Sequence, residues 1–258
     1  AVTGTPGDIY MTNDPWLASG HLSDFLLLMP AFKNGRVSGY TSCKSHLVDL
    51  GGLGLGPKGS DFFDEGLLIT RCKLVDQGET NALVACCEAG ASRLFEMMDD
   101  YSLNDLYALS DYIIDTSRRG TLEAIAEVPQ DVYINQMTAD GYETPLTLKA
   151  TLTVTKDRLH LDFSGTSGCS AKGVNVPLNY ATAYSVFAMR CTTGPDIPNN
   201  AGSLEPFVIT GPTNCILSAQ RPAPVAMRHT LGQMTPDLVL SCLHQALTHM
   251  VSAEGSSC

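Results

Sequence analysis

Apolar and polar residues alternate most regularly in the middle of the chain. From residue 146 to residue 155, leucine, alanine and valine take every second position, with threonine or lysine between them. A repeat of two residues is typical of a strand with one buried and one solvated face, which indicates an antiparallel sheet. Further strands are predicted over 158–163, after the turn Lys156-Asp157, and over 131–135.

The N-terminal part of the chain carries a second strand-turn-strand pattern. Short apolar runs predict three strands, over 9–12, 25–29 and 37–42. Asn34-Gly35, between the last two, is the signature of a tight hairpin turn. Such a hairpin would fold its second strand back beside the first and bring His46 towards His21.

Helical periodicity separates these two strand regions. Apolar residues recur at steps of three and four over 81–100, which predicts a helix. Ser102 resembles an N-cap and predicts a second helix, whose apolar stripe over 103–113 would be either core or a subunit contact. Later helices are predicted over 180–191 and 236–250.

Together these elements predict an α+β protein with mixed, largely antiparallel sheets and packed helices. We expect a first unit over 1–128, with the strand-turn-strand and two helices. A second unit over 129–258 would hold a β-meander followed by a helix-containing region. A boundary near residue 170, or one continuous domain, is the alternative.

Composition and charge narrow the class of protein. The 258 residues include 44% hydrophobic residues, 23 glycines and 14 prolines, which is typical of a loop-rich folded enzyme or enzyme part. A net charge of −11 disfavours nucleic acid and anionic membranes as partners. No apolar run approaches the ~20 residues of a membrane span, and no signal peptide is visible. Nine cysteines without a C-x-x-C pair indicate reduced thiols and a cytoplasmic protein.

Two histidine–aspartate units are the main candidate chemistry. His21 and Asp24 are separated by two residues, and His46 and Asp49 repeat this spacing 25 residues later. Imidazole nitrogen and carboxylate oxygen together form a ligand set for a divalent transition metal. H-x-x-D is a common tetrapeptide, so ordinary polar residues at strand ends are the alternative.

The two aspartates are not equivalent in this pattern. In a strand, residues three apart point to opposite faces, so His21 and Asp24 would face one metal only if the chain turns or bulges between them, which Gly20 and Ser23 allow. The glycines that follow Asp49 suggest a loop, where this rule does not apply. We therefore rank Asp49 above Asp24 as a direct ligand. Asn13 and Asp14 precede a proline and form either an Asx turn or a second layer, in which Asp14 orients a ligand histidine.

Other motifs predict less. The glycine-rich stretch 51–60 is either a loop that approaches a ligand or a plain surface loop. The stretch 165–168 is expected to be a loop rather than an anion cradle. Arg228-His229 is either a pair near a substrate or, by preference, a surface pair. Three further histidines are expected to be structural, namely His160, His244 and His249. No dinucleotide fingerprint, Walker A motif or Ser-His-Asp signature is present.

The residues around the two units carry a family resemblance. The first lies in Gly7-Asp8-Ile9-Tyr10-Met11-Thr12-Asn13-Asp14-Pro15 and Gly20-His21-Leu22-Ser23-Asp24, the second in His46-Leu47-Val48-Asp49-Leu50-Gly51-Gly52. Later segments include Asp64-Glu65-Gly66-Leu67, Gly173-Val174-Asn175-Val176-Pro177, Ile197-Pro198-Asn199-Asn200-Ala201-Gly202 and Pro222-Ala223-Pro224-Val225. Their order resembles the hydantoinase B family, which includes N-methylhydantoinase B, the C-terminal half of eukaryotic 5-oxoprolinase, and subunits of acetone and acetophenone carboxylases. Glu205-Pro206 departs from the family, which tends to have a basic residue before the proline.

The resemblance implies a function and a partner. Family members are about twice this length, so the chain would be the central fragment of a larger subunit. An ATP-binding hydantoinase A-type subunit, carrying ATP-Mg, would phosphorylate a lactam, imide or ketone. The present subunit would hold one divalent metal (Mn, Zn or Fe) on His21, His46 and Asp49, with Asp24 as a possible fourth ligand.

Three functions follow from this resemblance. The first is an ATP-dependent cyclic-amide hydrolase of the hydantoinase or oxoprolinase type, working as a hetero-oligomer. The second is an ATP-dependent ketone carboxylase that uses bicarbonate. The third is a non-catalytic assembly subunit whose histidines are structural.

Overall fold

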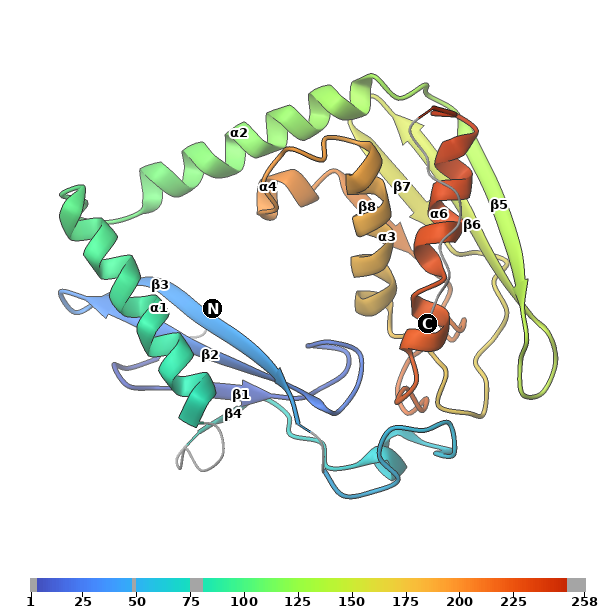
Figure 1. Ribbon diagram of the computed structural model, residues 1–258, viewed down its shortest axis with the longest axis horizontal. Helices are drawn as coiled ribbons and strands as arrows, with labels where there is room; N and C mark the ends of the chain where they lie inside the picture. Colours follow the sequence, from blue (N-terminus) through green and yellow to red (C-terminus); the bar gives the residue numbers. More distant parts are fainter. Residues whose placement is uncertain (1–3, 48–49, 75–80, 250–258) are drawn as a thin grey trace.

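The computed structural model describes residues 4–47, 50–74 and 81–249. Two four-stranded sheets form its framework, and the long helix α2 (Tyr107–Ala126) runs from one to the other (Figure 1). The two sheets lie in the sequence on either side of residue 128. The architecture is mixed α+β with largely antiparallel sheets, which confirms the predicted fold class.

The first sheet is antiparallel and has the strand order β3-β2-β1-β4. Its strands are β1 (Tyr10–Thr12), β2 (Asp24–Lys33), β3 (Arg36–His46) and β4 (Cys72–Lys73). Helix α1 (Asn81–Asp100), with the bounds that its periodicity predicts, packs on β2 and β3. It buries Leu27 with Val84 and Cys87, so the opposite face of the sheet is free of α1.

The hairpin between β2 and β3 confirms the turn prediction. Asn34 and Gly35 have φ angles of 52° and 74°, as a two-residue turn with both central residues left-handed requires. Lys33 pairs with Arg36, and the ladder continues, with one register shift, to Asp24 opposite His46. The turn therefore sets the register that places these last two residues side by side.

Replacing Gly35 with alanine is expected to lower the free energy of unfolding by about 1–2 kcal/mol, because a Cβ is disfavoured at positive φ. Gly56→Ala is the matched control, because a Cβ there meets open space and the φ is not positive. Chemical denaturation of both variants measures the difference. Equal stability of the two would contradict the role of the turn.

The second sheet has the strand order β5-β6-β7-β8. Its strands are β5 (Val132–Ala139), β6 (Leu146–Thr155), β7 (Arg158–Asp162) and β8 (Phe207–Thr210). The first three form the predicted antiparallel meander. The last pairs parallel to β7, because the chain passes through α3 (Leu178–Thr192) before it returns.

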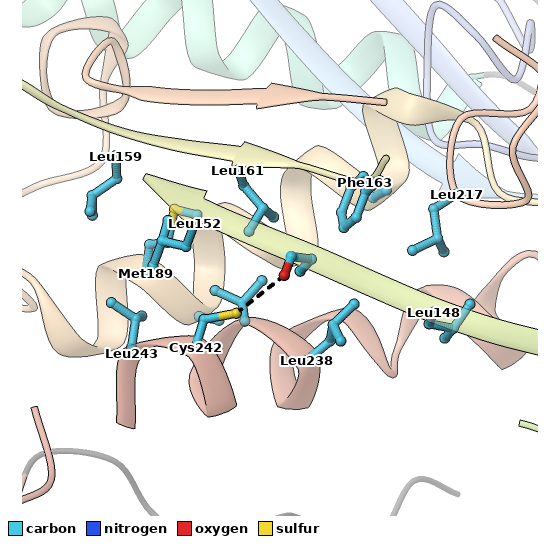
Figure 2. Packing of buried hydrophobic residues seen from close by; sticks show 14 of the residues in the cluster. Leu148, Leu152, Leu159, Leu161, Phe163, Met189, Leu217, Leu238, Cys242 and Leu243 are labelled. Carbon is cyan, nitrogen blue, oxygen red and sulfur yellow. Dashed lines mark hydrogen bonds between the residues drawn. The ribbon is translucent and has the colours of Figure 1, made fainter. Parts of the chain in front are cut away.

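The main core lies between this sheet and the helices α3 and α6 (Thr235–His244). Leu148, Ala150 and Leu152 of β6 are fully buried, which follows from the alternation in the sequence. Figure 2 shows the leucines of β6 and β7 packed above Cys242 and Leu243 of α6. The cysteines of the described residues are all free thiols, as the sequence predicts.

Two helix predictions were wrong at their ends. Ser102 has a φ of 54° and its N–H donates to the Asp99 carbonyl, so it closes α1 rather than capping α2. An N-cap needs an extended backbone, which this residue does not have. Helix α6 ends at His244, earlier than predicted, and residue 250 lies outside the described part.

Short helices join these elements: η1 (Phe62–Glu65), α4 (Ala201–Leu204) and α5 (His229–Gly232). Within the described ranges, none of the helices is long and apolar enough to cross a bilayer.

The two sheet regions meet at the loops that precede β2 and follow β3. Trp16 Nε1 donates to the Ala219 carbonyl at 2.8 Å, and the Asn179 side chain donates to the Pro15 carbonyl at 2.9 Å. The Phe62 N–H donates to the Pro222 carbonyl at 3.1 Å. Side chains from both ends of the chain therefore converge at this junction.

Candidate metal centre

The hairpin ladder brings two of the predicted ligands together. Asp24 is the first residue of β2 and His46 the last residue of β3, and they are register partners. Register partners lie on the same face of a sheet, here the face that α1 does not cover. His21 belongs to the loop before β2, so strand alternation does not separate it from Asp24.

The three side chains converge on the Asp24 carboxylate. Its Oδ1 lies 3.1 Å from His21 Nε2 and 3.0 Å from His46 Nδ1. Candidate ligand atoms of the three residues lie within 4.8 Å of one another. Two ligands bound tetrahedrally to one ion at about 2.1 Å are about 3.4 Å apart, and the 3.0 and 3.1 Å contacts of Asp24 Oδ1 are near that separation.

The His21 ring is buried and poorly satisfied, which makes it a candidate metal ligand. It is 3% exposed, and neither ring nitrogen has an aligned hydrogen-bond partner among the described residues. Buried polar atoms of native proteins are usually satisfied, so such a pair calls for an explanation. Burial lowers the pKa of His21, although Asp24 opposes this shift. The ring is therefore neutral at pH 7, as metal binding requires.

The Asp24 carboxylate remains charged in spite of its burial. Burial by itself would raise the pKa of Asp24, but the His21 and His46 rings beside the carboxylate outweigh it and hold the pKa well below its usual range. On the other oxygen, Oδ2, Lys44 Nζ lies at 3.4 Å and Arg228 Nη2 at 3.6 Å. One oxygen thus faces the histidines and the other faces cations.

The prediction that Arg228 belongs to a surface pair was wrong, because this residue is buried. It is 8% exposed, its Nε donates to the Ser19 carbonyl at 3.2 Å, and its guanidinium lies 4.6 Å from the Tyr180 ring centre. No local pattern in the sequence indicates this position, because all its partners are distant along the chain.

Asn13 and Asp14 contact the chain beside the cluster. Asp14 Oδ1 accepts from the Trp16 N–H, which forms the Asx turn, and its Oδ2 pairs with Arg221 instead of a ligand histidine. Asn13 donates to the Leu22 carbonyl at 2.9 Å and so fixes the backbone next to His21. Asp49, which ranks first among the predicted carboxylate ligands, lies outside the described residues.

Glu65 is a buried acid to which the sequence motifs assigned no role. Its Oε1 accepts from the N–H groups of Val225 and Ala226, at 2.6 and 2.8 Å, and its Oε2 has no partner among the described residues. Burial, opposed by these two bonds, raises the pKa of Glu65 to about 7. The carboxyl links η1 to the segment that leads to Arg228.

Two weaker motifs are structural. In the 165–168 stretch, the Thr166 and Ser167 N–H groups donate to the carbonyls of Phe163 and Thr147, so they are not free for an anion. His160 Nε2 bonds with Thr210 Oγ1 at 2.9 Å, between neighbouring strands. Both observations agree with the loop and structural roles expected from the sequence.

Comparison with known proteins establishes the family. The sequence matches the Hydantoinase B/oxoprolinase family over residues 2–82 and 77–258. The chain therefore belongs to this family, and the resemblance seen in its motifs is confirmed.

Three relatives illustrate the range of the family. The putative D-/L-hydantoinase B-type subunit of Pseudomonas sp. (strain NS671) is 26% identical over 97% of this chain and 49% of its own length. The beta chain of caprolactamase from Pseudomonas jessenii is 25% identical over 96% and 48%. 5-Oxoprolinase 1 of Arabidopsis thaliana is 24% identical over 91% and 23%. The chain thus spans half or less of the length of these curated relatives.

Two solved structures share the fold. The crystal structure of ATP-dependent caprolactamase from Pseudomonas jessenii has a TM-score of 0.86 at 23% identity, over 95% of this chain and 47% of that chain. The nucleotide-free structure of acetone carboxylase has a TM-score of 0.80 at 16% identity, over 93% and 37%.

Proposed function

We propose that this chain is the metal-binding part of an ATP-dependent hydrolase that opens cyclic amides. The convergence of His21, Asp24 and His46 on one point is the observation that carries the proposal. The relatives named hydantoinase, caprolactamase and 5-oxoprolinase support the choice of reaction. The buried His21 ring, whose Nε2 faces Asp24 Oδ1 and whose Nδ1 has no hydrogen-bond partner among the described residues, argues against an assembly subunit whose histidines are only structural.

A divalent ion (Mn, Zn or Fe) would be held by the two imidazoles and the Asp24 carboxylate, with Asp49 as a further candidate. Three protein ligands leave a position open for water or substrate, as in catalytic sites. When bound, the ion supplies Lewis acidity, which makes water nucleophilic at neutral pH or polarises a carbonyl.

The surrounding charges favour an anionic substrate. Lys44 and Arg228 flank the single carboxylate of the described cluster, so a bound divalent ion would leave the site with a net positive charge. A phosphorylated amide or enol oxygen, made by the partner from ATP, would balance that charge. Lys44 is half exposed and could reach such a group directly.

ATP-Mg would bind to a hydantoinase A-type subunit. The hydantoinase and caprolactamase relatives are themselves named as single subunits of their enzymes, which supports a hetero-oligomer. The first turns of α2 are a candidate contact, because Tyr107, Tyr112 and Ile113 are 74%, 67% and 44% exposed. This surface includes the C-terminal end of the predicted stripe over 103–113.

A ketone carboxylase that uses bicarbonate is the second candidate. The motif resemblance supports it, because the family includes subunits of acetone and acetophenone carboxylases, and the acetone carboxylase structure shares this fold. Such an enzyme would use the same residues to hold a metal, and its substrate would be a ketone in place of a lactam or imide.

The experiment uses the full-length subunit purified together with its ATP-binding partner. Elemental analysis is expected to find a divalent metal, and ATP turnover is expected to rise with a lactam and not with a ketone plus bicarbonate. The reverse substrate response would establish the carboxylase. A fully active complex without metal, or hydrolysis by this subunit alone, would refute the proposal.

A further inference from the structure

A cavity of about 440 Å³ lies on the face of the first sheet that α1 leaves free. It lies over the central strand β2, its neighbour β1 and the edge strand β4, and Leu17 closes one side. Its lining residues are Tyr10, Met11, Thr12, Leu17, Leu26, Leu28, Arg71, Cys72 and Lys73.

This cavity adjoins the candidate metal centre. Leu26 lines it and follows Asp24 by two residues in β2, so both side chains lie on one face, about 7 Å apart along the strand. In β3, which pairs with β2, His46 lies opposite Asp24 and Lys44 lies opposite Leu26. The cluster and the cavity are therefore neighbouring parts of a single surface.

The lining suits a hydrocarbon group. Leu26 and Leu28 line it from β2, and none of the described carboxylates is among its lining residues. The two cationic lining residues are Arg71, just before β4, and Lys73 in β4. Lys73 is ion-paired with Asp8. The histidine and aspartate side chains of the cluster lie beyond this lining, at Asp24, the first residue of β2.

We propose that this cavity binds the methylene ring of a cyclic amide, whose carbonyl group then lies at His21, Asp24 and His46. The inference rests on the proposed function and deepens it, because it assigns the residues that select the substrate. Cavities of 300–1,000 Å³ hold ligands up to drug size, so the ring of a lactam, with or without a substituent, fits within this one.

The test measures binding of 2-pyrrolidone, 2-piperidone and ε-caprolactam to the full-length complex by calorimetry, with a non-hydrolysable ATP analogue present. Each added methylene is expected to tighten binding about fourfold, the effect of burying one CH₂ group. Leu28→Trp, which fills the cavity, should weaken ε-caprolactam binding at least tenfold. Val132→Trp, an exposed strand position of the other sheet, is the matched control and should leave binding unchanged.

Leu28→Ala gives a second variant that does not depend on the fit of a large side chain. It should weaken ε-caprolactam binding several-fold and reduce the gain in affinity for each added methylene. Melting temperature and metal content are measured on every sample. Equal affinity for the three lactams, or affinities that are the same in the wild type and both Leu28 variants, would overturn the inference.

The same samples separate this inference from the proposed function. Dependence on ring size and on Leu28 in a complex that holds no metal would keep the cavity assignment and remove the metal-based reaction. Metal at full occupancy and lactam binding that is unchanged by ring size and by both Leu28 variants would keep the metal-based reaction and remove the cavity assignment.

Discussion

The Asp24→Asn variant is expected to lose the bound metal and to lower activity by more than the 10–100-fold typical of a residue that only orients a ligand. The reason is geometric, because Oδ1 of Asp24 is within 3.1 Å of a nitrogen of both histidines. Asparagine keeps the shape of the side chain and removes the charge. Elemental analysis and substrate-dependent ATP turnover of the full-length complex measure both effects.

Two further variants make this result interpretable. Asp99→Asn is the control, because Asp99 is an exposed carboxylate that pairs with Lys33 away from the cluster. His46→Ala should also lose the metal while it retains the fold, since the His46 side chain is 44% exposed. The melting temperature of Asp24→Asn is needed as well, because Arg228 loses a buried partner.

The same experiment decides the order of the two aspartates. Strand alternation ranks Asp49 above Asp24, but that argument does not apply to His21, which lies in a loop. Because His21 lies in a loop, we expect Asp24→Asn to lose at least as much bound metal as Asp49→Asn. Full metal retention in Asp24→Asn, with loss in Asp49→Asn, would restore the ranking that strand alternation predicts.

The Glu65→Gln variant is expected to become more stable than the wild type as the pH rises from about 4.5 to 7. In the folded protein the pKa of Glu65 is about 7, above its ordinary value of 4.5, because the carboxyl is buried. Between these values the folded state keeps a proton that the unfolded state releases, so the free energy of unfolding falls with rising pH. The shift corresponds to a loss of about 3 kcal/mol, complete above pH 7.

Glutamine should remove this loss, because its oxygen can accept the same two backbone N–H groups and it does not ionise. Below pH 4.5 the variant and the wild type should have similar stability. Denaturant unfolding from pH 4 to 8 gives the comparison, and Glu88→Gln, on the exposed side of α1, is the control. Parallel pH profiles for wild type and Glu65→Gln would show that Glu65 is not protonated in the folded protein.

The sequence alone determined the elements whose signals are local. The alternation over 146–155 predicted β6 residue for residue, and the periodicity over 81–100 predicted α1. Asn34-Gly35 predicted the hairpin, and with it the approach of His46 to the region of His21. These predictions succeed because neighbouring residues in the chain supply both the pattern and the turn geometry.

Only the tertiary structure decided which side chains surround the cluster. Arg228 reaches Asp24 from the far end of the chain, and Glu65 meets the N–H groups of Val225 and Ala226. The parallel pairing of β8 with β7 and the start of α2 were equally absent from the local pattern. Contacts between residues so far apart in sequence depend on how whole elements pack, and no periodicity within one element records them.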